Sequence, residues 1–173
     1  MTCLGILQGS QSTSVSPDLA ITLGVVFRLT DSEYHMYKNI LVPVDLEHKD
    51  QAAAMISAAL SMADNGAKLT LVFVMPEMPA VVGLYLPEGT IQKAKSDAEE
   101  QLLALAKANN AADTTSIETA IGRPHHEILE MAKAKNVDLI VIASHKPGIA
   151  DYLLGSVAAG VVRHAKCSVH VMR

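Results

Sequence analysis

A Gly-Ser pair at Gly155 and Ser156 carries the clearest chemical signal in this sequence, because it stands where a helix is expected to begin. The first N–H groups of a helix are unpaired and bear a partial positive charge, so they bind anions. Gly155 lets a ligand approach the backbone closely, and the Ser156 hydroxyl can cap the helix or bond a ligand oxygen. Upstream, Ser144, His145 and Lys146 offer two hydrogen-bond donors and a positive charge. The pattern favours a phosphate-bearing ligand, and a plain turn with a helix cap is the alternative that the spacing leaves open.

Motifs of several common enzyme classes are missing from the sequence. There is no GxxxxGK[ST] phosphate loop, no GxGxxG after the first expected strand and no GxSxG nucleophile elbow. Asp151 is the one acid between residues 143 and 156. A nucleotide hydrolase needs a positioned base and usually a metal held by acids at the phosphates. We therefore predict no catalytic residue, and slow nucleotide hydrolysis has the least support among the functions considered.

The adjacent histidines His125 and His126 are the most obvious potential metal ligands. On a helix they point about 100° apart, so they cannot face one ion together. No cysteine or acid is spaced to complete a zinc set with them. We expect both histidines to face solvent and expect no metal site formed by the protein itself.

Composition excludes further classes of function. The 173 residues are 50% hydrophobic and carry a formal charge of −4, with a pI of about 5.9. A nucleic-acid-binding protein needs a cationic surface and often stacking aromatics, but aromatics make up only 3% of this chain. No apolar run approaches the roughly 20 residues that a bilayer requires, so no membrane partner is expected. Cys3 and Cys167 show no CxxC spacing, which fits a reducing cytoplasm.

Alternating strands and helices are expected to position these residues. Short apolar runs predict strands, and amphipathic or alanine-rich stretches predict helices. The strands are expected at Asn39–Val44, Leu69–Val74, Ser116–Ile121, Leu139–Ala143 and Val169–Met172. The helices are expected at Asp50–Ala63, with Asn65-Gly66 as its C-cap, at Thr90–Ala108, from Pro124 through Ala132, and at Ser156–His164. This alternation predicts a doubly wound α/β fold, whose ligands bind beyond the carboxyl ends of the strands.

The sequence changes character at Met36. Residues 1–35 contain nine Ser or Thr, three acids and one base, without a sustained period of 2 or 3.6. We expect 36–173 to form the α/β domain and 1–35 to be an extension, either disordered or translated upstream of a natural start at Met36.

The C-terminal run Ser168–Met172 is expected to form an edge strand, with backbone groups that need a partner. It contains no proline, so a second copy of the chain could pair with it antiparallel in a two-fold dimer. We therefore predict a homodimer through this strand.

Four segments are similar to one known family. They read MYKNILVPVDL, KLTLVFVMPE, GRPHHEILEMAKAKNVDLIVIASHKP and YLLGSVAAGVVRHAKCSVHVMR. Together they resemble the universal stress protein family over Met36–Arg173, and ASHKPGIxxYLLGS resembles its F/G-type subgroup most. The resemblance implies a five-stranded sheet in the order 3-2-1-4-5, dimerisation through the last strand, and a cytoplasmic stress-response role. One branch of the family binds ATP, so ATP, with or without Mg²⁺, is the expected ligand.

The family's ATP motif, G-x2-G-x9-G-[ST], is altered in this chain. Ala143 stands at the first glycine, Lys146 stands at the second, and the stretch to Gly155 is one residue short. Carried over by position, the nucleoside side of the site consists of Pro43, Val44, Asp45 and Val74. Its phosphate side consists of Ala143, Ser144, His145, Gly155, Ser156 and Val157. An interaction module of the same fold that binds no nucleotide is the alternative.

Overall fold

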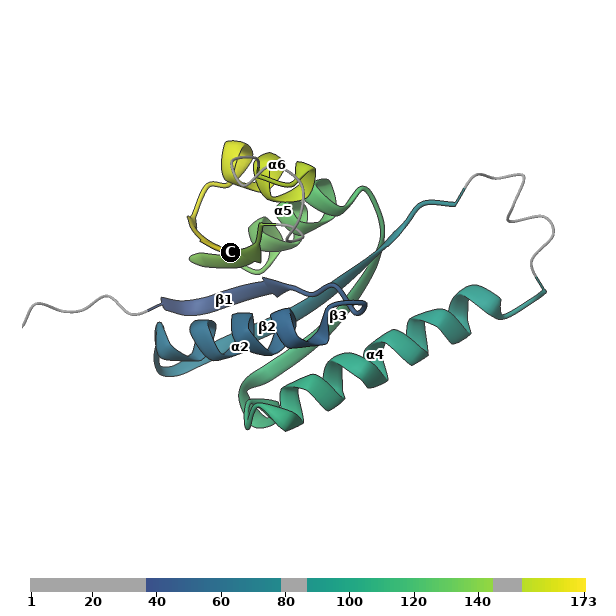
Figure 1. The fold of residues 1–173 in the computed structure, drawn as a ribbon, viewed down its shortest axis with the longest axis horizontal. Coiled ribbons are helices and arrows are strands. Elements are labelled where there is room, and N and C mark those ends of the chain that lie inside the picture. The colour runs from purple at the N-terminus through teal and green to yellow at the C-terminus, as the bar shows by residue number, and fades with distance from the viewer. Residues whose placement is uncertain (1–36, 79–86, 145–153) are drawn as a thin grey trace, which may run out of the picture. The chain divides into compact units, whose positions relative to one another are not determined.

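A parallel five-stranded sheet forms the centre of the computed structural model, which describes residues 37–78, 87–144 and 154–173 (Figure 1). Its strands are β1 (Tyr37–Pro43), β2 (Ala63–Pro76), β3 (Thr115–Gly122), β4 (Leu139–Ala143) and β5 (Ser168–Met172). They lie in the order β3-β2-β1-β4-β5, and every neighbouring pair is parallel. The predicted doubly wound fold and its strand order are confirmed.

Two pairs of helices cover the sheet, one pair on each face (Figure 1). The helices are α2 (Lys49–Ser61), α4 (Thr90–Ala108), α5 (Pro124–Ala134) and α6 (Ser156–His164), and a short 3-10 turn spans Ala112–Thr114. The helices α2 and α4 pack on one face, and α5 and α6 pack on the other.

The middle of β1 and nearly all of β4 are apolar because both of their faces are buried. Successive side chains of a strand point to opposite faces. In β1, Ile40 and Val42 therefore enter the core under α2 and α4, whereas Leu41 enters the core under α5 and α6. All three are at most 2% exposed, and burial of a side chain of this size contributes roughly 1.5–3 kcal/mol. This packing fixes the ends of the strands, where the candidate site lies.

One sequence-based expectation, the C-cap at Asn65-Gly66, is wrong. Helix α2 already ends at Ser61, where the N–H of Met62 donates to the carbonyls of Ala58 and Ala59. Gly66 instead lies inside β2, at an irregularity in the pairing between β1 and β2. Its φ of +78° explains why glycine stands there, since other residues rarely adopt that conformation.

Two sets of predictions fall on residues outside the described ranges. These are the character of 1–35 and the positions of His145 and Lys146. Within the described ranges, no helix is both long enough and apolar enough to cross a membrane.

Candidate functional site

A cavity of about 930 Å³ opens at the carboxyl ends of β1, β2 and β4. This volume falls in the usual range of small-molecule sites, roughly 300–1,000 Å³. Eight of the eleven predicted site residues line it: Pro43, Val44, Asp45, Val74, Ala143, Gly155, Ser156 and Val157. The topology brings these residues together because parallel strands end at the same edge of the sheet.

Ser144 lies apart from this lining. Its side chain is buried, and its N–H donates to the carbonyl of Met172 at 2.7 Å, which continues the pairing of β4 with β5. In this structure Ser144 therefore supports the strand behind the cavity. His145 and Lys146 lie outside the described residues.

The start of α6 forms one end of the cavity. Gly155 is the N-cap and Ser156 is the first helical residue, so of the two roles considered for the Ser156 hydroxyl, capping is not observed. The Ser156 side chain is exposed, and no side-chain hydrogen bond caps this helix. The first turn of α6 contains no acid, whereas the first turns of α2 and α5 contain Asp50 and Glu127. Of these three helix starts, α6 is therefore the most favourable for an anion.

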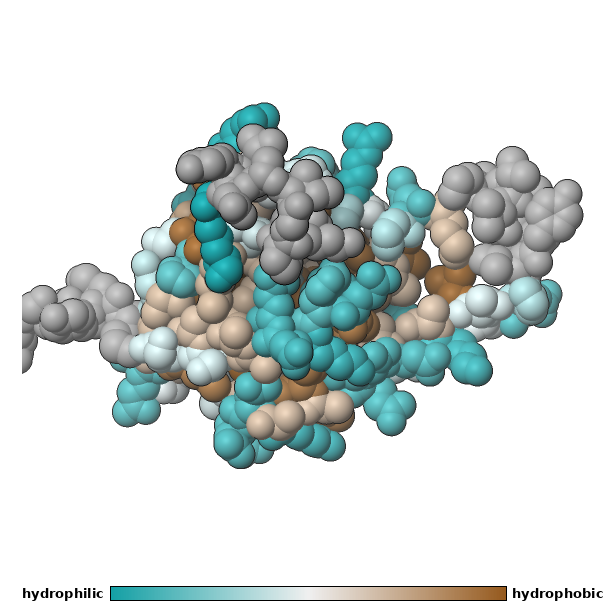
Figure 2. All heavy atoms as spheres, viewed as in Figure 1, coloured by the Kyte–Doolittle hydropathy of each residue, from teal (hydrophilic) through white to brown (hydrophobic). Residues whose placement is uncertain are grey.

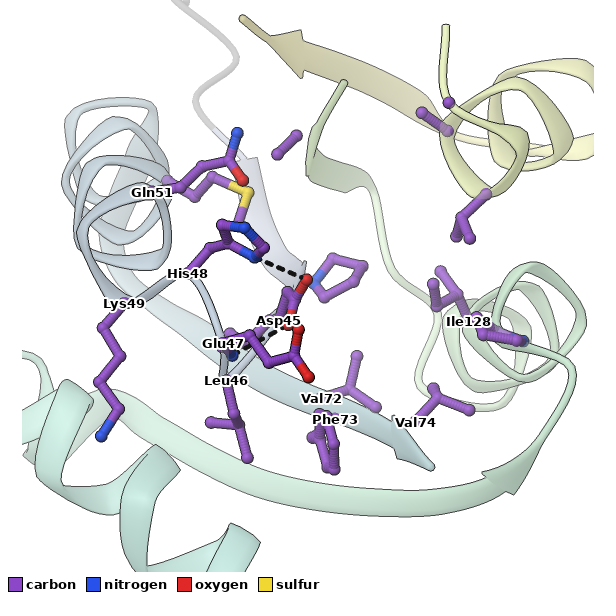
Figure 3. Close-up of a pocket in the computed structure, with 18 of the residues that line it drawn as sticks. Asp45, Leu46, Glu47, His48, Lys49, Gln51, Val72, Phe73, Val74 and Ile128 are labelled. Carbon is purple, nitrogen blue, oxygen red and sulfur yellow. Dashed lines mark hydrogen bonds and ion pairs between the residues drawn. The ribbon is translucent and has the colours of Figure 1, made fainter. Parts of the chain in front are cut away.

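The opposite end is the turn between β1 and α2. One carboxylate oxygen of Asp45, Oδ1, accepts the N–H of Glu47 at 3.0 Å. The other, Oδ2, lies 3.0 Å from Nδ1 of His48, and the His48 N–H donates to the Asp45 carbonyl at 3.1 Å. Such a turn is typical of an aspartate that follows a strand. In Figure 3, Lys49 points away from the Asp45 carboxylate, so the lysine does not neutralise it by contact.

Apolar side chains connect the two ends. They come from all the elements around the cavity and include Val44, Met55, Val72, Phe73, Val74, Pro124 and Ile128. Figure 2 shows hydrophilic side chains over the β1–α2 connection, with apolar atoms beside them. A cavity with apolar walls and polar groups at its ends suits a ligand that joins a flat apolar part to polar parts.

Sequence reasoning missed Glu47, His48, Phe73, Pro124 and Ile128 as lining residues. The apolar members look like ordinary core or helix-start residues in the sequence. His48 carried a usable signal, because a polar side chain three positions after a strand-ending aspartate can turn back onto it.

In the described part of the chain, the residues that could hold a metal ion lie in the turn between β1 and α2, and His125 and His126 are not among them. Within residues 37–78, 87–144 and 154–173, one group of three could face a single ion: Asp45, Glu47 and His48, with ligand atoms within 4.8 Å of one another. Of the two adjacent histidines, His126 is exposed, with Nδ1 3.2 Å from Oε1 of Glu127. His125 is half-buried against Gly160 of α6, so the expectation of two solvent-facing histidines is wrong for this residue.

Comparison with known proteins identifies the family. The model of the universal stress protein family matches residues 36–173. The chain belongs to this family. The chain is 29% identical to universal stress protein G of Escherichia coli O157:H7 over 144 residues, which cover 80% of this chain and 100% of that protein. It is 31% identical to universal stress protein YxiE of Bacillus subtilis over 150 residues, with the same coverage.

Solved structures of universal stress proteins share the fold. Universal stress protein UspA from Lactobacillus plantarum is 31% identical and superimposes with a TM-score of 0.58 over 79% of this chain and 98% of that one. Two members at lower TM-scores, 0.47 and 0.49, were solved in complex with cAMP and, for the protein from Archaeoglobus fulgidus, with dAMP.

Proposed function

We propose that the cavity binds an adenine nucleotide, with ATP as the first candidate. The observation that carries this proposal is the polarity of the cavity: an acid-bearing turn at one end, an acid-free helix start at the other and apolar walls between them. Adenine is flat and largely apolar, ribose donates hydrogen bonds through its hydroxyls, and phosphate is anionic. Each of these parts therefore has a surface of matching chemistry in the cavity wall.

Each part has a named partner in this arrangement. Val44 and Val74 contact the base. The exposed Asp45 carboxylate accepts hydrogen bonds from the ribose. The phosphates lie at Gly155 and Ser156, where the first N–H groups of α6 have no side-chain cap and carry the positive end of the helix dipole. Mg²⁺, where it is present, arrives with the phosphates.

The biological role follows from binding, without a chemical step. A ligand that prefers one state of a protein stabilises that state and shifts its population, and this can change the choice of partner. We therefore assign the chain a stress-response role in the cytoplasm, exerted through dimerisation or partner binding. Two cysteines in 173 residues fit that compartment.

Calorimetric titration with ATP, ADP and AMP, with and without Mg²⁺, tests the nucleotide proposal. The decisive variant is Gly155→Val. The φ of −55° and ψ of 153° at Gly155 are open to any residue, so valine adds bulk at the cavity without backbone strain. We expect a loss of ATP affinity of about tenfold or more, with an unchanged melting temperature. Gly155→Ala is the matched control and should show a smaller loss.

Two results would contradict this proposal. If Gly155→Val binds ATP as tightly as the parent protein does, the phosphate end has been misplaced. If the parent protein binds no adenine nucleotide under any of these conditions, the chain acts as an interaction module without a nucleotide.

The homodimer is the second part of the proposed function, and β5 is its interface. The Ser168 N–H donates to the carbonyl of Asp138, and the Met172 carbonyl accepts the N–H of Ser144. Successive backbone groups of a strand point to alternate sides, so the N–H groups of Val169 and Val171 point to the outer edge. That edge is available to the same strand of a second copy.

Proline substitutions at the outward positions test the interface. Val169→Pro and Val171→Pro remove outer-edge donors while leaving the bonds from β5 to β4 in place. We expect each variant to have monomer mass by light scattering at micromolar concentration. Val169→Ala and Val171→Ala are the matched controls, because they shorten the same side chains but keep the N–H, and they should remain dimers. A parent protein that is already monomeric would rule out this interface.

A further inference from the structure

His48 occupies the N-cap of α2 but does not cap the helix through its side chain. N-cap residues are usually Ser, Thr, Asp or Asn, whose side chains accept N–H groups of the first turn. Here no side-chain cap bond forms, and only the His48 carbonyl takes part in the helix, accepting the N–H of Ala52 at 3.1 Å. The imidazole turns instead toward Asp45, with Nδ1 3.0 Å from Oδ2 (Figure 3).

This contact determines how the Asp45 carboxylate is presented. An ionised carboxylate only accepts hydrogen bonds, so Nδ1 of His48 must carry the hydrogen that is shared. The other oxygen of Asp45 accepts the N–H of Glu47. Each oxygen offers about two lone-pair positions, so one remains on each oxygen after these bonds. The Asp45 side chain is 59% exposed and lines the cavity, so its carboxylate is open to a ligand there.

We propose that His48 is a positioning residue of the cavity, holding the Asp45 carboxylate so that its two free acceptors meet the neighbouring hydroxyls of a vicinal diol. The ligand class is a ribonucleotide, selected over the corresponding 2′-deoxyribonucleotide. The inference rests on the proposed nucleotide function. It assigns the selectivity to His48, which lies at the opposite end of the cavity from the proposed phosphate site.

Paired titrations with ATP and 2′-deoxy-ATP at pH 7.5 test the positioning. We expect the parent protein to prefer ATP by about tenfold, because the deoxy ligand leaves one carboxylate acceptor unpaired. His48→Ala should weaken ATP binding roughly two- to tenfold, since Asp45 must then be ordered on binding, and should leave 2′-deoxy-ATP binding nearly unchanged. The melting temperature of each variant serves as the control for folding.

Two matched variants distinguish positioning from a general structural role. His48→Asn keeps an N–H donor near the place of Nδ1 and should restore the preference for ATP. His48→Gln places its amide farther out, near the place of Nε2, and should not restore it.

The outcomes separate the two proposals. A parent protein that binds no nucleotide refutes the proposed function and this inference with it. A parent that binds ATP and 2′-deoxy-ATP equally well, or a His48→Ala variant that keeps the full preference, overturns the role of His48 alone.

Discussion

At the scale of single residues, Cys167 shows how its surroundings set the reactivity of a side chain. It is half-buried and lies just before β5. Partial burial is the larger of two causes that raise the pKa of its thiol above the ordinary value, and the negative charge of Asp138 is the other. Because only the thiolate is nucleophilic, a raised pKa lowers the reactive fraction at a given pH. We expect Cys167 to react with iodoacetamide at pH 8 more slowly than an unstructured cysteine, which argues for a packing role.

Removing the Asp138 charge tests this account. Asp138→Asn should lower the pKa of Cys167 and increase the alkylation rate at pH 8 roughly two- to threefold. Burial is the larger cause, so the variant should still react more slowly than the unfolded protein does. Peptide mass spectrometry separates Cys167 from Cys3, and an Asp138→Asn rate equal to that of the parent would contradict the assigned cause.

At the scale of elements, α5 and α6 approach closely at Gly160. A Cβ at this position would lie 3.0 Å from both Cβ and Cγ of His125. In an open helix, alanine is more stable than glycine by about 1 kcal/mol. Here the contact reverses the sign, because Cβ of His125 is fixed to the backbone of α5 and cannot rotate away. We expect Gly160→Ala to lower the free energy of unfolding by about 1–2 kcal/mol, as measured by urea denaturation.

The control is a double-mutant cycle with His125→Ala. That change removes Cγ and keeps Cβ, so Gly160→Ala should cost less in this background but should still not stabilise the protein. A stabilising Gly160→Ala variant would mean that the two helices separate without cost. Both helices begin at the cavity, with Pro124 and Ser156 in its wall. The ATP affinity of the Gly160→Ala variant therefore reports whether the packing of α5 against α6 affects the site.

At the scale of the whole molecule, the boundary at Met36 separates the family domain from the residues before it. The family model matches residues 36–173, and the described strands and helices all lie within that range. We expect a Met36–Arg173 protein to have the melting temperature of the full chain. Differential scanning calorimetry measures this, and a loss of several degrees would show that 1–35 stabilise the domain.

A longer deletion is the matched control for that experiment. Removing residues 1–42 also deletes most of β1, which pairs with β2 and β4 at the centre of the sheet. This chain should not fold. Retention of a cooperative transition in it would contradict the central place of β1.

Local patterns in the sequence determined the elements of the fold. The bounds predicted for Thr90–Ala108, Leu139–Ala143 and Ser156–His164 are those observed, because an amphipathic stripe and a fully apolar run are visible within a short window. The strand order was predicted from the family resemblance instead, since pairing between distant strands leaves no local pattern.

Only the tertiary structure decided how the elements meet. Gly66 was assigned to a helix end, because glycine often ends helices, but pairing with β1 places it inside β2. The approach of His125 to Gly160 and the cavity wall shared by Phe73 and Ile128 join segments far apart in the chain. The bond from His48 to Asp45 is local in sequence, yet the direction of an exposed side chain depends on the φ and ψ of its turn. Residue types therefore determined which chemistry was available, and the path of the backbone decided which groups meet.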